Sequence, residues 1–210
     1  MMNTKAKEIG AVNTNFLTPH GLDEEGHYST AFDLALLADY ALNIPYLANI
    51  FAKKSETIFI NGSPRNISTT NEMLYGYNGA NGVKTGFTND AGRCLVTAAT
   101  NSEGWQLISV VLGCDTKNFR TQDSRKILDY GFKNFKLVNI GDILPSCIVF
   151  EVEKSLDKMY KIEFFYEQMY PLKEEEFEKI HYKEEVKENM IAPIQKNSEI
   201  AKYSIYIRRR

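Results

Sequence analysis

Apolar residues dominate the chain between residues 29 and 52 and recur there at helical spacing. This pattern predicts a helix that begins at Ser29 or Thr30, followed by a shorter helix that begins at Pro45. Thr30 and Asp33 have the spacing of a capping box, with Asp in the place usually taken by Glu. Because the first helix is apolar over much of its surface, we predict that it is buried.

Strand-like segments rich in β-branched and aromatic residues follow. Four segments have this character: "SETIFI", "GVKTGFT", "GRCLVTAAT" and "WQLISVVLGC". Asn61-Gly62 is a hairpin turn signal, and "NSEG" between the last two segments has the length of a hairpin loop. The next segment, residues 116–135, predicts a helix with Ile127 and Leu128 near its apolar face. We therefore expect an antiparallel sheet covered by helices.

The two ends of the chain differ from this central region. Residues 2–9 predict a short helix that Gly10 ends, and residues 11–28 predict a long ordered loop. Toward the C-terminus, short apolar runs alternate with acidic turns, which indicates a small separate β-domain. The expected fold class is therefore α+β, with a sheet-and-helix domain over residues 1–137 and a small all-β domain over residues 138–210.

Composition and charge exclude several classes of function. An apolar fraction of 43% and an aromatic fraction of 12% are typical of a packed globular protein. The net charge of -2 provides no field that would attract nucleic acid, so we expect no nucleic-acid partner. The three cysteines, Cys94, Cys114 and Cys147, and the three histidines have no metal-ligand spacing. We therefore expect reduced, half-buried cysteines, no metal site and no cofactor.

Lys84, Thr85 and Gly86 form an unusual triplet on one of the predicted strands. Lysine and glycine are poor strand formers, and a glycine within a strand often marks the close approach of another backbone. The functional interpretation is that Lys84 lies beside a nucleophile, Thr85 bonds a substrate carboxylate, and an extended peptide lies along the strand at Gly86. The structural alternative is an edge strand on which the lysine only prevents aggregation.

The segments around this triplet resemble one protein family in their order and spacing. The matching segments are "MNTKAKEIG", "NTNFLTPHGLDEEGHYSTAFDLALLA", "GVKTGFTNDAGRCLVTAAT", "LISVVLGC" and "FRTQDSRKILDYGF". The chain from Met2 to about Phe135 thereby resembles the later part of the catalytic domain of the low-molecular-weight penicillin-binding proteins, the serine-type D-Ala-D-Ala carboxypeptidases. The C-terminal residues resemble the β-domain of that family more loosely. The resemblance implies a partial DD-peptidase/β-lactamase-like domain followed by this small β-domain.

The resemblance also implies roles for four residues. It gives Lys84 a catalytic and a substrate-binding role, and it gives substrate binding to Thr85, Gly86 and Arg120. The guanidinium of Arg120 would hold the terminal carboxylate of the substrate, and backbone N–H groups near Gly86 would stabilise the oxyanion. The structural alternative for Arg120 is a surface ion pair, for which Asp123 is a candidate partner.

The sequence departs from the family pattern in two respects. Phe87 stands where the family often has a polar residue, so substrate preference is expected to differ. The family nucleophile lies in a Ser-x-x-Lys motif that is followed by Ser-x-Asn, and both motifs precede the helix that "MNTKAKEIG" ends. The chain has no Ser-x-Asn, and its one Ser-x-x-Lys, Ser155 to Lys158, is expected to be a solvated turn. The resemblance therefore implies a C-terminal fragment that is inactive alone.

Two functions follow as hypotheses. In the first, the chain is part of a carboxypeptidase that removes terminal D-alanine from peptidoglycan stem peptides through an acyl-enzyme. β-Lactam antibiotics would then acylate the full-length protein. In the second, the chain is a non-catalytic or vestigial module that binds the same peptides. A β-lactamase is a weaker third option, because the extra β-domain argues against it.

The cellular location is implied only by the resemblance, which places the family outside the cytoplasmic membrane, in the periplasm or cell envelope. The chain has no apolar run of 18 residues, and its N-terminal segment lacks the apolar core of a signal peptide. Membrane anchoring, which is frequent in the family, would require C-terminal sequence absent from this chain. The basic triplet at residues 208–210 could precede such an anchor or form an ordinary charged end.

Overall fold

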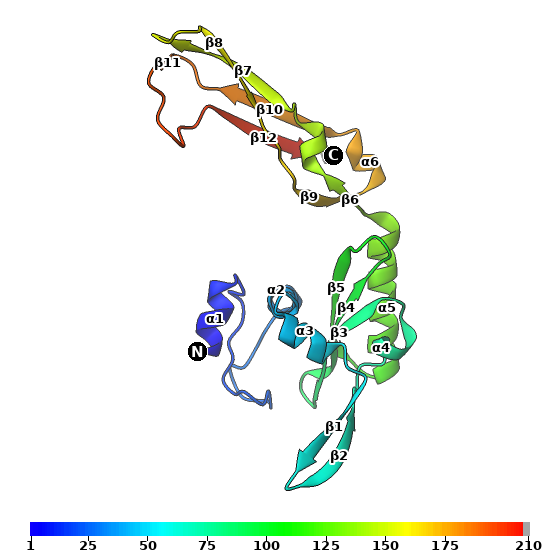
Figure 1. The fold of residues 1–210 in the computed structure, drawn as a ribbon. Coiled ribbons are helices and arrows are strands. Elements are labelled where there is room, and N and C mark those ends of the chain that lie inside the picture. The colour runs from blue at the N-terminus through cyan, green and yellow to red at the C-terminus, as the bar shows by residue number, and fades with distance from the viewer. Residues whose placement is uncertain (208–210) are drawn as a thin grey trace. The chain divides into compact units, whose positions relative to one another are not determined.

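The computed structural model describes residues 1–207, which form two compact units (Figure 1). Unit 1 comprises residues 1–133, and unit 2 comprises the described residues from 134 onward. The change in composition suggests a domain boundary after residue 137, whereas the contacts divide the chain after residue 133. The basic triplet at residues 208–210 lies outside the described residues.

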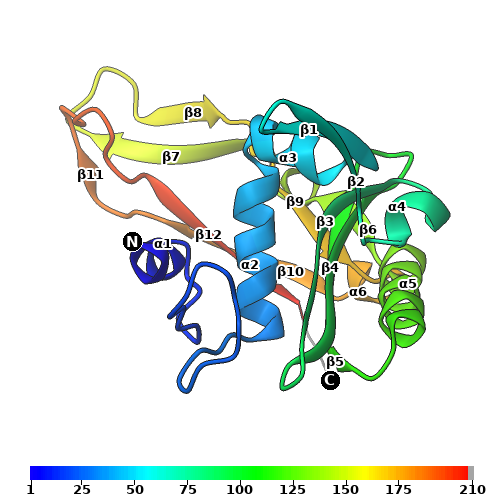
Figure 2. The same ribbon diagram turned by 90° about the horizontal axis from the view of Figure 1, so that it is seen from below.

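Unit 1 is built on an antiparallel sheet of three strands in the order β3-β4-β5. Helices α2 and α3 lie on one face of this sheet, and α4 and α5 lie on the other (Figures 1 and 2). The helices are α1 (Met2–Glu8), α2 (Ala31–Leu42), α3 (Pro45–Phe51), α4 (Met73–Gly76) and α5 (Lys117–Asn134). The strands are β1 (Ser55–Ile60), β2 (Ser63–Ser68), β3 (Ala80–Thr88), β4 (Gly92–Thr100) and β5 (Gln106–Cys114). The expected antiparallel sheet with helices on its faces is confirmed.

The core of unit 1 lies between the sheet and α5. Alternate residues of β4 face this helix, and Leu95 and Ala99 are buried there against Met73 of α4 and Leu128 of α5. Burying a side chain of this size contributes about 1.5–3 kcal/mol relative to exposure. This packing holds α5 across the sheet, so the first turn of the helix has a fixed position beside the strands.

β3 is an edge strand of the sheet. It pairs with β4 along its length, and no other strand pairs with it within residues 1–207. Gly79 lies immediately before β3 with a φ of +77°, and a Cβ atom there would lie 2.0 Å from the carbonyl oxygen of Thr100. Only glycine fits this turn, which brings the start of β3 against the end of β4. The other edge of β3 has no strand partner among the described residues, and the side chains of Asn71 and Lys84 donate hydrogen bonds to the carbonyl oxygens of Gly82 and Thr85.

The predicted burial of the helix that follows Thr30 is wrong. The helix itself is confirmed as α2, and the Oγ1 of Thr30 accepts a hydrogen bond from the amide of Asp33, as the capping spacing predicts. Only Asp33 and Ala38 of α2 are buried, and Phe32 is 69% exposed. The sheet and α3 cover part of the apolar surface of α2, and no described segment covers Phe32.

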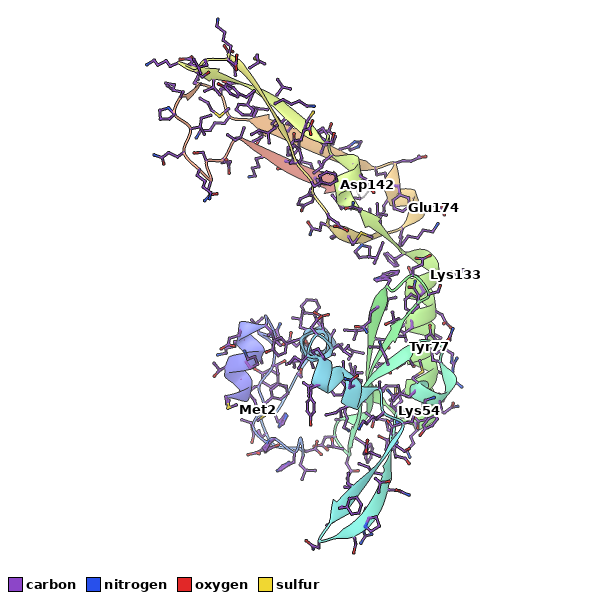
Figure 3. All side chains as sticks on the ribbon, viewed as in Figure 1. Met2, Lys54, Tyr77, Lys133, Asp142 and Glu174 are labelled. Atoms are coloured by element: carbon purple, nitrogen blue, oxygen red, sulfur yellow. The ribbon has the colours of Figure 1, made fainter. Side chains whose placement is uncertain are left out.

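A second correction concerns the hairpin at Asn61-Gly62. The turn is confirmed, with both residues at positive φ, and the strand that completes it is β2, which is not among the four predicted strand segments. The prediction missed β2 because it contains Pro64 and few apolar residues. Every residue of β1 and β2 is exposed, and the hairpin extends away from Lys54 at its base (Figure 3).

Unit 2 consists mainly of short antiparallel strands, as predicted. These are β6 (Lys136–Asn139), β7 (Cys147–Glu153), β8 (Met159–Glu163), β9 (Met169–Leu172), β10 (Ile180–Val186), β11 (Met190–Ile191) and β12 (Ala201–Ile207). They pair as β11-β7-β8, β10-β12 and β6-β9, and the 3-10 helix η1 (Ile140–Ile143) and α6 (Glu174–Phe177) connect them. Alternate residues of β7, Ile148, Phe150 and Val152, form its core with Met190. β6, β9 and β10 were not predicted, because each lacks a clear alternation of apolar and polar residues.

The Ser-x-x-Lys spacing at Ser155 to Lys158 lies in the turn between β7 and β8, as predicted. The hydroxyl of Ser155 donates hydrogen bonds to the carbonyl oxygens of Val152 and Asp157, which is typical of a turn residue. Within residues 1–207, no single helix has both the length and the apolar composition to cross a membrane. Only α2 and α3 taken together, with a bend of 111° between them, meet both criteria.

Candidate functional site

Lys84, Thr85 and Gly86 lie in the middle of β3, at the edge of the sheet. Thr85 pairs with the core residue Leu95 of β4 and therefore faces α5, whereas Lys84 and Gly86 face the opposite side. Lys84 and Gly86 are exposed, and Thr85 is buried. The Nζ of Lys84 donates a hydrogen bond of 2.6 Å to the carbonyl oxygen of Thr85. The triplet thus presents to solvent a cation at Lys84 and, at Gly86, a position without a side chain.

A short path of hydrogen bonds connects Thr85 to Arg120. The Oγ1 atoms of Thr85 and Thr70 lie 2.5 Å apart. The Nη2 of Arg120 donates a hydrogen bond of 3.0 Å to the carbonyl oxygen of Thr70. Thr70 lies just before α4 and Arg120 in the first turn of α5, so three segments distant in sequence meet at the edge of the sheet.

Arg120 is only 2% exposed, and its charge is balanced by Glu72. The Nη2 of Arg120 lies 3.0 Å from Oε2 of Glu72, and the hydroxyl of Thr121 donates to the same oxygen. Burial alone would raise the pKa of the Glu72 carboxyl, but a backbone hydrogen bond and the contacts with Arg120 outweigh burial and lower it. Protonation therefore breaks the ion pair at a lower pH than it would for a carboxyl with an ordinary pKa, and the stability that the pair contributes is lost as the pH falls through the lowered pKa. Asp123, the partner considered from the sequence, pairs instead with Lys126.

A cavity of about 570 Å³ lies beside these residues. Its wall is formed by the loop at residues 20–22, by β3 and β4, and by the first turn of α5. Lys84, Thr85, Gly86 and Arg120 all line it, so the structure brings together the four residues to which the resemblance gives a role. A cavity that combines fixed cations, a hydroxyl and an open strand edge can bind an extended chain that ends in an anionic group.

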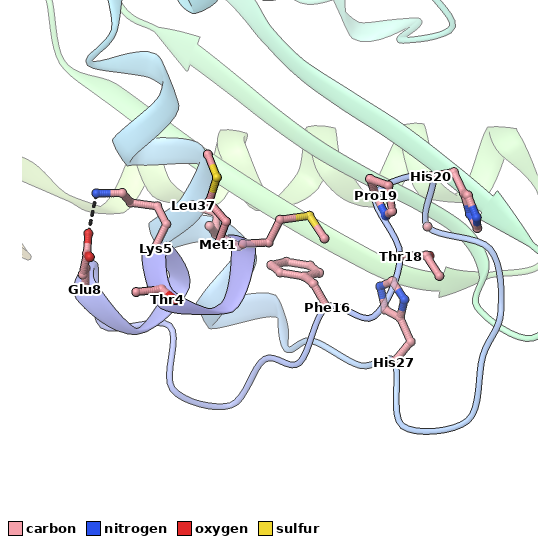
Figure 4. Close-up of a pocket in the computed structure, with 12 residues that line it drawn as sticks. Met1, Thr4, Lys5, Glu8, Phe16, Thr18, Pro19, His20, His27 and Leu37 are labelled. Carbon is pink, nitrogen blue, oxygen red and sulfur yellow. Dashed lines mark hydrogen bonds and ion pairs between the residues drawn. The ribbon is translucent and has the colours of Figure 1, made fainter.

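A second cavity, of about 690 Å³, lies on the N-terminal side of unit 1 (Figure 4). Its wall is mostly apolar, and the rings of Phe16 and His27 pack edge to face there at 5.9 Å. Lys5 and Glu8, the two charged residues that line it, form an ion pair with each other. This cavity was not predicted from the sequence.

The cysteines and histidines do not form a metal or redox centre within the described residues. Cys94, Cys114 and Cys147 are free and half-buried, as predicted. Burial, with smaller contributions from nearby acidic groups, raises the pKa of the Cys114 thiol, which favours the unreactive protonated form. No three His, Cys, Asp or Glu side chains within residues 1–207 gather closely enough to hold a metal ion.

Two members of the site, Thr70 and Glu72, were not predicted from the sequence. Both lie in "STTNEML", a short polar segment without a motif. Thr70 connects Thr85 to Arg120, and Glu72 fixes the guanidinium of Arg120. Arg120 lies 50 positions after Thr70 and 48 positions after Glu72, and no local sequence pattern reveals contacts over such separations.

Comparison with known proteins identifies the family to which the chain belongs. The Peptidase_S11 family, described as D-alanyl-D-alanine carboxypeptidase, matches residues 1–116. The D-alanyl-D-alanine carboxypeptidase DacF of Bacillus subtilis is 31% identical over 201 residues, which is 95% of this chain and 51% of that protein. DacC of Escherichia coli is 40% identical over 140 residues, which is 66% of this chain and 34% of that protein.

Solved structures give the same result. Penicillin binding protein 5 from Haemophilus influenzae superimposes with a TM-score of 0.79 at 29% identity, covering 98% of this chain and 60% of that one. The Streptomyces K15 DD-transpeptidase superimposes with a TM-score of 0.59 at 36% identity, covering 63% of this chain and 52% of that one. The chain spans about half the length of DacF. The family match covers more than half of the chain, and the protein therefore belongs to the D-alanyl-D-alanine carboxypeptidase family.

Proposed function

We propose that the cavity beside β3 binds the C-terminal end of peptides that terminate in D-Ala-D-Ala. The chain would thereby form the substrate-binding part of a serine-type D-Ala-D-Ala carboxypeptidase. This enzyme would remove terminal D-alanine from peptidoglycan stem peptides through an acyl-enzyme. The observation that carries the proposal is the convergence of Lys84, Thr85, Gly86 and Arg120 on one cavity at an unpaired strand edge. The family membership supports the same substrate class.

Each of the four residues has a distinct role in this proposal. The peptide extends along β3 and pairs with its backbone, and the missing side chain at Gly86 leaves room for this approach. The hydroxyl of Thr85 and the guanidinium of Arg120 bind the terminal carboxylate. Lys84 supplies a positive charge on the other face of the strand, beside the carbonyl that is attacked, and so stabilises negative charge that develops there.

The serine that becomes acylated is not among these residues. The chain contains no Ser-x-Asn, and Ser155 of its one Ser-x-x-Lys spacing lies in a turn of unit 2. The alternative is therefore a module that binds the peptide without cleaving it. Labelled penicillin separates the two: covalent labelling of this chain would mean that it contains a nucleophile, whereas labelling that requires further sequence supports the carboxypeptidase. In that protein, which would act in the periplasm or cell envelope, β-lactams would bind as substrate mimics.

Peptide binding is tested with two ligands that differ only at the C-terminus. We expect the acetylated peptide Ac-Gln-D-Ala-D-Ala to bind at least about tenfold more tightly than its C-terminal amide, because the amide cannot form a charge-assisted pair with Arg120. Calorimetry or anisotropy of a labelled peptide measures both dissociation constants. Equal affinity for the acid and the amide would contradict the proposed function.

A further inference from the structure

The cavity beside β3 carries more positive charge than one carboxylate requires. Four basic side chains line it: Lys84, Arg93, Lys117 and Arg120. Only Arg120 has a carboxylate within ion-pair distance among the described residues, namely Glu72. Three cations therefore face one cavity without an acidic partner, and their combined field favours an anionic ligand there.

Arg93 is held in place by an aromatic ring. It pairs with Phe87 across β3 and β4, so the two side chains share a face of the sheet. The guanidinium carbon of Arg93 lies 4.1 Å from the centroid of the Phe87 ring, within the range of a cation–π contact. A stacked guanidinium keeps its N–H groups free at the edge of its plane, where they can bind a carboxylate in a bidentate manner. Phe87 is 53% exposed, and its ring serves here as the support for Arg93.

The first turn of α5 adds an independent indication of an anionic ligand. Lys117 is the first residue of this 18-residue helix, Arg120 follows in the same turn, and the turn has no acidic residue. Cations at a helix N-terminus are opposed by the positive end of the helix dipole. The buried Nε of Arg120 also lacks a hydrogen-bond partner. An anion in the cavity would offset both costs.

We propose that Arg93, supported by Phe87, is a specificity-determining residue that binds a second carboxylate of the peptide, upstream of the terminal one. The inference rests on the proposed function, in which Thr85 and Arg120 hold the terminal carboxylate. Phe87 lies two residues beyond Thr85, a spacing of about 6.7 Å along a strand. A peptide extended along β3 therefore brings the side chain two residues before its C-terminus to Arg93, and an acidic side chain at that position is preferred.

The test compares Ac-Glu-D-Ala-D-Ala with Ac-Gln-D-Ala-D-Ala, which have the same length and nearly the same shape. We expect the protein to bind the glutamate peptide about fivefold more tightly, the effect of one partly exposed, charge-assisted pair. The ratio of the two dissociation constants should fall to about one in Arg93→Gln. In the unsubstituted protein the preference should weaken as the salt concentration is raised. The matched control is Arg125→Gln, which removes another arginine stacked on an aromatic ring, Tyr77, outside this cavity. This control should keep the preference.

The outcomes separate the inference from the proposed function. If the protein fails to distinguish a free C-terminal carboxylate from an amide, the proposed function is wrong. If it makes that distinction but binds the two peptides equally, or keeps its preference in Arg93→Gln, the role of Arg93 is overturned. Circular dichroism checks folding, and if Arg93→Gln does not fold, Phe87→Leu removes the support instead. Phe87→Leu should also reduce the preference, and an unchanged preference in that variant counts against the inference.

Discussion

Replacement of Gly86 by valine is expected to reduce binding of D-Ala-D-Ala peptides by about fivefold to 150-fold, since overpacking a close contact costs about 1–3 kcal/mol. Gly86 is exposed on the unpaired edge strand, on the cavity wall. A branched side chain there occupies the space that the peptide backbone must enter. The measurement is the dissociation constant of Ac-Gln-D-Ala-D-Ala for the protein and the variant.

The same substitution should leave the fold as stable as before. A Cβ atom at residue 86 would lie 3.9 Å from the Cβ of Cys94, an ordinary contact, and no closer atom opposes it. Valine also has a higher strand propensity than glycine. Gln106→Val, on a strand of the same sheet that does not border β3, is the matched control and should keep peptide affinity. Unchanged peptide affinity in a folded Gly86→Val protein would show that the peptide does not lie along β3.

Arg120→Ala is expected to abolish the preference for a free C-terminal carboxylate over an amide. A hydrogen bond to a charged group contributes about 1.5–3 kcal/mol, which corresponds to a loss of about tenfold to a hundredfold in affinity for the acid peptide. The affinity for the amide peptide should change much less, because that peptide carries no carboxylate. The ratio of the two dissociation constants is therefore the quantity to measure.

The stability of the Arg120 variant must be measured alongside. Removing the guanidinium leaves the carbonyl oxygen of Thr70 and the carboxylate of Glu72 without their shared donor, which costs about 1–3 kcal/mol of folding free energy. Arg120→Lys keeps the charge but cannot hold Thr70 and Glu72 while also reaching the ligand, so it should recover only part of the preference. Lys126→Gln, an exposed position on the same helix, is the control. A full preference retained in Arg120→Ala would remove Arg120 from the site.

Much of the candidate site could be predicted because its signals are local. A lysine followed two residues later by a glycine within a strand indicates an edge and a close approach, and β3 is such an edge. The segment order of the chain resembles that of a family whose membership is confirmed, which brought Arg120 into the same site despite its distance in sequence from Lys84.

The remaining features depend on three-dimensional contacts that local patterns do not encode. Glu72 acts only because α4 lies beside the first turn of α5, and its segment carries no motif. The burial of α2 was overpredicted because an apolar helix surface favours packing against another segment but does not show that such a segment is present. No described segment packs over Phe32, which is exposed. Strands β2 and β10 were missed because exposed strands without apolar alternation resemble loops in sequence.

The central claim is that the edge of β3 at Lys84, Thr85 and Gly86, together with Arg120, receives the C-terminus of the peptide. Titration of the ¹⁵N-labelled protein with Ac-Gln-D-Ala-D-Ala tests it most directly. We predict that the largest chemical-shift changes occur at the backbone amides of residues 84–88 and at the side chain of Arg120. Changes confined to the cavity around Phe16, or no change at saturating peptide, would contradict the claim.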